Sequence, residues 1–189
     1  MQDAAGTKEE FMSLRQFMSS YLAISAAREY WTLDDAISAP KNSVAYLTQH
    51  PLIQQLPGLG TDLDMTPSLC GALGPSLVYL WIGTGGTRTP LHFDSYNNLF
   101  VQLVGVKYIR IYGEQETSKL HVSRNKLYGL QGNMSDVDCE REDYESFPGA
   151  KNAQYQEVLL FPGDAVFIPA RAWHYVRSLT TSMSVNYGF

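Results

Sequence analysis

The chain has 189 residues, a length that suits one domain with a single buried core. Its residues are 44% hydrophobic and 17% charged, a composition that excludes an intrinsically disordered chain. The net charge of -5 at pH 7 argues against a nucleic-acid partner, because such proteins usually carry a basic face that neutralises phosphates.

The two cysteines, Cys70 and Cys139, lie far apart and lack Cys-x-x-Cys spacing, so neither a disulfide framework nor a zinc knuckle is expected. The first residues lack the basic region and the following apolar region of a signal peptide, and no stretch reaches the roughly 18 apolar residues of a membrane span. We therefore expect no membrane association and an intracellular location, in the nucleus, the cytoplasm or both. Nothing in the sequence indicates an oligomeric state.

Residues 1 to about 75 are expected to form helices and loops. Segment 10–22 carries apolar side chains at helical spacing: Phe11, Leu14, Phe17, Met18 and Leu22. This stripe predicts a helix that packs on a sheet. Thr32, Asp34 and Asp35 form a second cluster typical of a helix start.

From about residue 76 to residue 189, short runs of Val, Ile, Leu and Tyr predict strands that form the core of a barrel. The runs are SLVYLWIG, NLFVQLV, KYIRIY, QEVLLF, DAVFIP, HYVRSL and SMSVNYGF. Tight turns at Gly105-Val106 and at residues 162–164 favour antiparallel hairpins. The expected fold class is mainly β, a jelly-roll sandwich or barrel that hides most strand edges, with the N-terminal helices packed on it.

Segment 113–153 interrupts the series of strands and is expected to be an insertion within one domain spanning residues 1–189. Its acidic run, SDVDCEREDYESF, is expected to be a solvated face. Loops around the barrel mouth, this segment included, are expected to choose the substrate.

The stretch PLHFD contains a His-x-Asp pair, and every second residue of a strand points to the same side. His92 and Asp94 can therefore reach one point in space, although such a pair alone is a weak signal. His174 opens a later strand. If that strand lies beside the strand of His92, its imidazole enters the site from the opposite wall of the barrel. Two imidazoles and one carboxylate form the facial triad that binds iron(II) and leaves positions open for a co-substrate and O2.

Lys107 begins the strand KYIRIY, fifteen residues after His92. A lysine buried in a barrel needs an anionic partner, and the distal carboxylate of 2-oxoglutarate would supply one. Thr89 is a candidate hydroxyl donor to the same carboxylate. The alternatives are a surface lysine at a hairpin start and, for Thr89 and Asn98, turn or strand-edge roles.

Taken together, TPLHFD, Asn98, GVKYIRIY and FPGDAVFIPARAWHYVRSL resemble the JmjC-domain 2-oxoglutarate oxygenases, in particular the small JmjC-only protein hydroxylases. The likeness runs from about Tyr46 to Phe189 and implies a double-stranded β-helix of the cupin kind. The stretches WIGTGGTRTPLHFDSYNNLFVQLVGVKYIRIYGEQE and WHYVRSL are most similar to the subgroup that contains lysine-specific demethylase eight. That subgroup is regarded mainly as protein arginyl hydroxylases.

The resemblance implies an iron site and a co-substrate site. The implied iron ligands are His92, Asp94 and His174. The implied 2-oxoglutarate residues are Lys107, Thr89 and Tyr46 at the distal carboxylate, Asn98 near the metal end, and Asn186.

Trp81 matches a tryptophan that lines the substrate pocket of the subgroup, with plain core packing as the alternative role. Asn186 matches an asparagine of the factor-inhibiting-HIF type of hydroxylase, where the arginyl hydroxylases tend to have serine. The chain ends at Phe189, where the subgroup continues, and starts without the first strands expected. The resemblance therefore implies a shortened form.

The implied activity is hydroxylation of a protein side chain, with arginine favoured. Iron(II) is the bound cofactor, 2-oxoglutarate and O2 are consumed, and succinate and CO2 are released. Two alternatives stay open. One is N-methyl demethylation of lysine by the same chemistry, and the other is a non-catalytic cupin that acts as a binding module.

Overall fold

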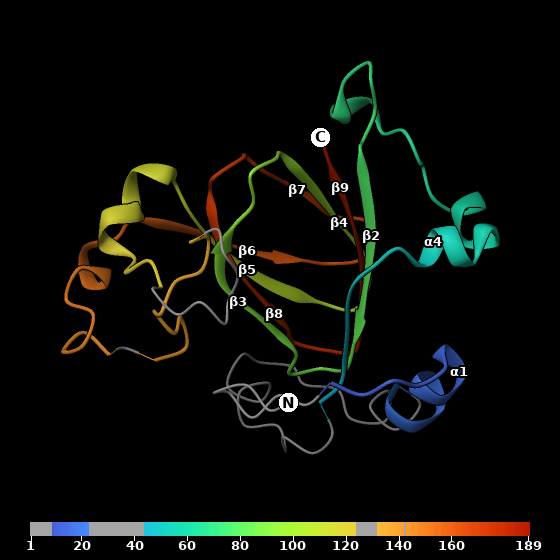
Figure 1. Ribbon diagram of the computed structural model, residues 1–189, viewed down its shortest axis with the longest axis horizontal. Helices are drawn as coiled ribbons and strands as arrows, with labels where there is room; N and C mark the ends of the chain where they lie inside the picture. The colour runs from blue at the N-terminus through green and yellow to red at the C-terminus, as the bar shows by residue number, and fades with distance from the viewer. Residues whose placement is uncertain (1–8, 23–43, 124–131, 142) are drawn as a thin grey trace.

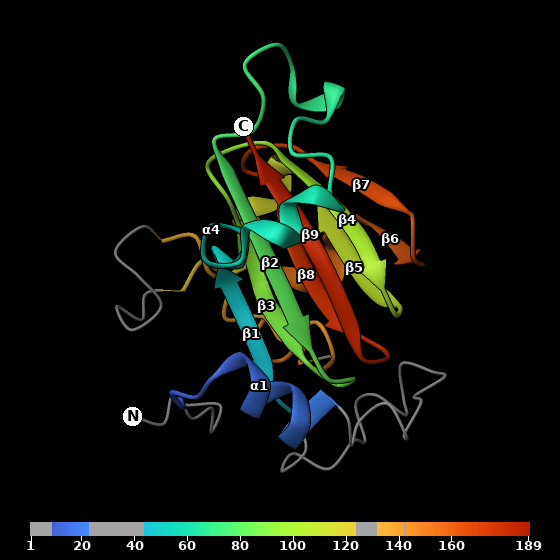
Figure 2. The same ribbon diagram turned by 90° about the vertical axis from the view of Figure 1, so that its right-hand side faces the viewer.

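The computed structural model describes residues 9–22, 44–123, 132–141 and 143–189, and its strands form two antiparallel sheets packed face to face (Figure 1). The five-stranded sheet has the order β1-β2-β9-β4-β7, and the four-stranded sheet has the order β3-β8-β5-β6. The mainly β, jelly-roll fold predicted from the sequence is confirmed. Figure 2 looks onto the five-stranded sheet, with helix α4 in front of it.

The strands of the first sheet are β1 (Tyr46–His50), β2 (Leu77–Gly83), β9 (Ser182–Gly188), β4 (Asn98–Val104) and β7 (Ala165–Ile168). Those of the second are β3 (Arg88–Phe93), β8 (Trp173–Ser178), β5 (Lys107–Tyr112) and β6 (Tyr155–Leu160). The helical segments are short: α1 (Leu14–Phe17), a π-helical stretch (Met18–Leu22), α4 (Leu52–Gln55), and 3-10 segments at Pro57–Thr61, Ser68–Cys70, Glu114–Lys119 and Ala150–Asn152.

The tight turns connect the two sheets, so the prediction of hairpins was wrong. Strand β4 bonds to β9 and β7, whereas β5 bonds to β8 and β6, and Gly105 carries the chain from one sheet to the other. The turn at residues 162–164 does the same between β6 and β7. A short turn fixes the reversal of the chain, but the hydrogen-bond partners of each strand are set by burial of its two faces.

The N-terminal part departs from the expected helices and loops in two ways. YLTQH forms strand β1, which pairs with β2 at the edge of the five-stranded sheet. Helix α1 begins at Leu14 because Ser13 caps it, accepting a hydrogen bond from the Gln16 backbone N–H in a capping box. Phe11 therefore precedes the helix and is fully exposed, and Met18 is 51% exposed, so the predicted apolar stripe is wrong at both positions. The cluster at residues 32–35 lies outside the described residues.

Both sheets are largely covered on both faces, except on the outer sides of β6 and β7, where Leu159 and Phe167 are exposed. Between the sheets lie Phe100, Ile109, Leu160, Ile168, Ala172 and Val176. The outer face of the five-stranded sheet packs against α4 and the segment after it, through Leu52, Cys70, Leu80, Leu99, Val185 and Tyr187. The outer face of the four-stranded sheet packs against segment 113–153, through Leu91, Tyr108, Tyr112, Leu120, Ala153, Trp173, Tyr175 and Leu179.

Segment 113–153 lies between β5 and β6, and its yellow and orange ribbon covers the outer side of the four-stranded sheet (Figure 1). It therefore acts as an outer layer of the core, and its described part is more than a loop at the barrel mouth. Its acidic run is not uniformly solvated, because the side chain of Glu140 is 8% exposed and lies against Arg177. The expectation of a purely solvated acidic face was wrong at this residue.

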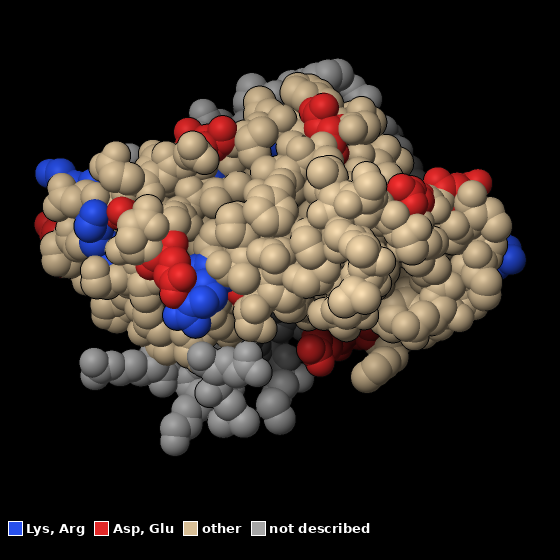
Figure 3. All heavy atoms as spheres, turned by 90° about the horizontal axis from the view of Figure 1, so that it is seen from above, with Lys and Arg blue, Asp and Glu red and all other residues tan. Residues whose placement is uncertain are grey.

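The surface carries charges in small, scattered groups on the face seen in Figure 3, where Lys and Arg form no continuous basic area. Within the described part of the chain, no helix has the length and apolar character needed to cross a membrane.

The turn at Gly105 generates a testable prediction. Its φ of +73° is left-handed, and an added Cβ would lie 2.0 Å from the Thr181 carbonyl oxygen. Gly105→Ala should therefore lower the free energy of unfolding, measured in urea, by about 3 kcal/mol or more. Gly163→Ala is the control, because Gly163 also has a positive φ, of +94°, but open space around it. The control should lose only about 1–2 kcal/mol, and equal losses in the two variants would contradict the steric account.

Candidate metal centre

Strands β3 and β8 place two histidines side by side. The antiparallel register pairs His92 directly with His174, and their ring centroids lie 4.1 Å apart. Along β8 the side chains alternate, so Trp173 and Tyr175 enter the outer core while His174 faces the interior. The expectation that His174 enters from the opposite wall was wrong, because the two rings come from neighbouring strands of one sheet.

An irregularity in β3 brings Thr89 to the same side as His92. In a regular strand, residues three apart point to opposite faces. Here Thr89 pairs with Val176 and His92 pairs with His174, so β3 contains one residue more than β8 between these pairs. Such a bulge tolerates Pro90, which has no N–H to donate to the ladder.

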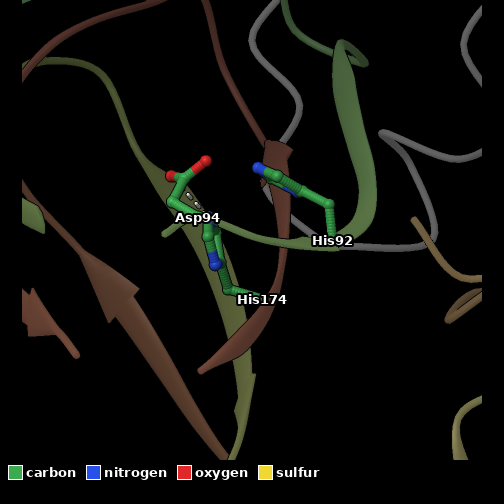
Figure 4. A group of neighbouring side chains, drawn as sticks. All are labelled: His92, Asp94 and His174. Atoms are coloured by element: carbon green, nitrogen blue, oxygen red, sulfur yellow. Dashed lines mark ion pairs between the residues drawn. The ribbon is translucent and has the colours of Figure 1, made fainter. Parts of the chain in front are cut away.

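Asp94 completes the group just beyond the end of β3, so its position does not follow from strand alternation as expected. Its backbone carbonyl accepts a hydrogen bond of 2.7 Å from the Arg171 N–H, and Asn98 hydrogen-bonds its carboxylate. One ligand atom from each of His92, Asp94 and His174 lies within 4.8 Å of the others. Figure 4 shows the three side chains pointing toward one another.

Each histidine is held by the backbone carbonyl of the residue two positions before it. The Nδ1 of His92 lies 2.8 Å from the Pro90 carbonyl oxygen, and the Nδ1 of His174 lies 3.1 Å from that of Ala172. Because a carbonyl oxygen only accepts hydrogen bonds, both Nδ1 atoms carry the proton. Both Nε2 atoms are then left with a lone pair for a metal.

The surroundings keep the ligand atoms available. Burial, with a smaller contribution from His92, lowers the pKa of His174 to about 3, so its imidazole is neutral at physiological pH. Burial raises the pKa of Asp94, against the opposing effects of His92 and the hydrogen bond from Asn98. A dication between these groups would favour the ionised carboxylate, and two imidazoles with one carboxylate suit iron(II).

Lys107 lies four residues before the position on β5 that opposes His174, and it is buried without an anionic partner among the described residues. Its side chain is fully buried on the inner face of β5, and its Nζ has no hydrogen-bond partner among the described residues. The ammonium lies 5.5 Å from the ring centroid of Tyr46 and 5.3 Å from that of Phe100. Burial lowers the pKa of Lys107 to about 7. The alternative of a surface lysine is therefore wrong, and a bound anion would stabilise this group.

One pocket gathers most of the side chains singled out from the sequence: Tyr46, Trp81, Thr89, His92, Asp94, Asn98, His174 and Asn186. Lys107 adjoins it through Tyr46 and Phe100. The Tyr46 hydroxyl lies 3.5 Å from the Thr89 hydroxyl, and burial raises the pKa of Tyr46 to about 12, so both groups remain neutral donors.

Trp81 and Asn186 form another wall of the pocket. The Trp81 indole N–H donates a 2.7 Å hydrogen bond to the Asn186 side-chain oxygen, and the Tyr46 and Trp81 rings lie 5.7 Å apart. Asn186 is thus engaged with Trp81, and both side chains line the pocket.

The sequence reasoning missed four pocket residues: Gln49, Tyr96, Phe100 and Val176. Gln49 has a left-handed φ of +47° in an irregular part of β1, a strand that was not predicted. Phe100 and Val176 follow from alternation, since Asn98 and His174 lie two residues before them. Tyr96 had no signal beyond its position two residues after Asp94.

A family model described as a cupin-like domain matches residues 2–189. JmjC domain-containing protein F of Dictyostelium discoideum is 38% identical over 204 residues, covering 96% of this chain and 42% of that protein. Lysine-specific demethylase 8 of Xenopus tropicalis is 40% identical over 152 residues, covering 78% and 33% respectively. Lysine-specific demethylase JMJ30 of Arabidopsis thaliana is 39% identical over 144 residues, covering 75% and 33%. The chain thus spans less than half the length of these relatives.

The burial of Lys107 predicts an unusual stability effect. Lys107→Met should raise the free energy of unfolding of the ligand-free chain at pH 6 by about 1–4 kcal/mol, because methionine fills the space without a charge to desolvate. Below the folded-state pKa of about 7 both states hold the proton, and the penalty of burial is complete. Between that value and 10.5, the folded wild type releases the proton and recovers stability, so the gain should shrink at pH 9.

Urea unfolding at pH 6 and pH 9 checks this prediction. Lys119→Met is the control, because Lys119 is partly exposed and forms a 2.8 Å ion pair with Glu116. The control should show no gain at either pH. A loss of stability for Lys107→Met at pH 6 would contradict the assignment of an unneutralised buried cation.

Proposed function

Because the chain belongs to the JmjC-type family of cupin-like domains, we propose that it is an iron(II)- and 2-oxoglutarate-dependent oxygenase that oxidises a protein side chain. One observation carries the proposal: two histidines and a carboxylate line a pocket together with Tyr46 and Phe100, and the rings of these two residues also contact a buried, unpartnered lysine. The two histidines and the carboxylate suit a ferrous ion. The buried lysine suits the far carboxylate of a dicarboxylate whose other end binds the ion.

The three ligand residues would hold the metal with their prepared atoms. The Nε2 atoms of His92 and His174 carry no proton, because each Nδ1–H donates to a backbone carbonyl. Asn98 orients the carboxylate of Asp94. Three protein ligands leave coordination positions for other molecules. When bound, iron(II) with 2-oxoglutarate and O2 supplies the oxidation of a substrate C–H bond, with release of succinate and CO2.

Lys107 would bind the distal carboxylate of 2-oxoglutarate. Its Nζ gains the missing charge partner, and the hydroxyls of Tyr46 and Thr89 lie close enough together to donate to the same group. This arrangement would orient the co-substrate between the lysine and the metal ligands. Phe100 and Val176 contribute apolar surface to the same pocket.

Arginyl hydroxylation is the form of the activity that we favour, on the resemblance of the sequence. Lysine N-methyl demethylation is the second candidate, because relatives carry the name lysine-specific demethylase. The aromatic rings of Tyr46 and Trp81 suit either cation, since guanidinium and methylammonium groups both bind aromatic faces. A protein substrate in the nucleus or cytoplasm is part of this proposal.

A non-catalytic binding module is a weaker candidate. Such a protein gains nothing from an unpartnered buried cation near a pocket lined by three metal-ligand side chains, since a buried charge lowers stability.

Removal of one ligand tests the proposed activity. His174→Ala should reduce iron-dependent conversion of 2-oxoglutarate to succinate by more than about 100-fold. His121→Ala is the matched control, because His121 is 55% exposed, its Nδ1 lies 3.1 Å from the Asp136 carboxylate, and it does not line the pocket. Turnover should be retained in the control, and full turnover in His174→Ala would refute the ligand assignment.

Mass spectrometry of peptides separates the two candidate reactions. Arginine-containing and methyl-lysine-containing peptides are incubated with the protein, iron(II), 2-oxoglutarate and O2. A gain of one oxygen on the arginine peptide is expected. Loss of a methyl group from the lysine peptide, with the arginine peptide unchanged, would replace hydroxylation by demethylation.

A further inference from the structure

The second edge of strand β3 is paired with segment 133–135 of the insertion. On its first edge, β3 bonds to β8. On the other, the Phe93 N–H donates to the Asn133 carbonyl at 3.0 Å, and the Ser135 N–H donates to the Leu91 carbonyl at 2.9 Å. Met134 forms a β-bridge with His92 itself. The backbone that carries His92 is thus held on both sides.

Asn133 also fixes the step from His92 to Asp94. Its side-chain amide donates a 3.0 Å hydrogen bond to the Phe93 carbonyl, in addition to the backbone bond from the Phe93 N–H. Phe93 is the residue between the two ligands, so both of its backbone polar groups are held by Asn133. The direction of the chain as it leaves β3 therefore depends on the insertion.

Glu140 anchors this segment to both ligand-bearing strands. Arg88 of β3 is paired in register with Arg177 of β8, and like charges directly opposite one another destabilise a sheet. The Glu140 carboxylate lies 3.3 Å from Arg177 Nε and 3.7 Å from Arg88 Nη1, and it accepts a hydrogen bond from the Tyr175 hydroxyl. The carboxylate is only 8% exposed, so its charge is weakly screened by solvent.

We infer that Glu140 and Asn133 are positioning residues, which act through β3 to set the geometry of His92 and Asp94 for metal binding. The inference rests on the proposed function. Glu140 contacts both arginines, and the carboxylate of Asp138 lies 3.6 Å from Arg88 as well. By reducing the repulsion between the two arginines, Glu140 keeps β3 and β8 in the register that opposes the two ligand histidines. Asn133 holds the end of β3 directly. Metal ligands need to be held within about 0.5 Å of their productive positions, so loosening either contact should weaken the site.

The test measures metal affinity apart from activity. Binding of Mn²⁺ is measured by isothermal titration calorimetry for the full chain and for the variants Glu140→Gln and Asn133→Ala, with thermal unfolding of each metal-free protein alongside. Both variants should bind Mn²⁺ about tenfold more weakly than the wild type, the size of effect typical of groups that orient metal ligands.

Glu116→Gln is the matched control. Glu116 is a buried carboxylate of the same insertion, but it pairs with Lys119 and accepts from the Gln154 N–H, away from β3. Its loss should lower the unfolding temperature and leave Mn²⁺ affinity unchanged. Wild-type Mn²⁺ affinity in a folded Glu140→Gln variant would overturn the inference. A fall in the Mn²⁺ affinity of Glu116→Gln in proportion to its lower unfolding temperature would also overturn it, because affinity would then follow stability alone. If Glu140→Gln does not fold, unchanged affinity in Asn133→Ala overturns it. Absence of Mn²⁺ binding by the wild type would instead overturn the proposed function.

Discussion

The register between β3 and β8 is the constraint on which the site depends. It places His92 opposite His174, and the extra residue in β3 places Thr89 on the same side three positions earlier. A shift of one residue would turn these side chains to the outer face, where the insertion packs. The apolar alternation of β8, with Trp173 and Tyr175 outward in a buried cluster, makes that shift unfavourable.

The interior of the barrel combines apolar side chains that stabilise the fold with a buried lysine that destabilises it. Ile109 and Val176 fill the space between the sheets with apolar contacts, but Lys107 adds a buried cation to the same layer. The buried clusters on the outer faces of the two sheets offset this destabilisation, because they bury large apolar side chains such as Trp173 and Leu80. The insertion therefore contributes to the core and also pairs with the edge of β3.

Much of the candidate site could be predicted from the sequence, because short motifs mark it. The His-x-Asp pair and the histidine after a Pro-bounded strand are local patterns, and together with Lys107 they resemble a known family. The contribution of segment 133–135 could not be predicted, since pairing between β3 and a segment about 40 residues later leaves no local signal. Glu140 belongs to an acidic run whose composition is typical of a solvated face, and the sequence does not show that two arginines lie against it. The turn sequences predict hairpins because a sequence shows where the chain reverses but not which strand the next strand pairs with.

The most direct test of the central claim is a crystal structure of the chain with Mn²⁺ and 2-oxoglutarate. The account predicts one manganese ion bonded to the Nε2 atoms of His92 and His174 and to the Asp94 carboxylate, with the distal carboxylate of 2-oxoglutarate hydrogen-bonded to Lys107 Nζ. A metal bound elsewhere, or a co-substrate that leaves Lys107 without an anion, would contradict it.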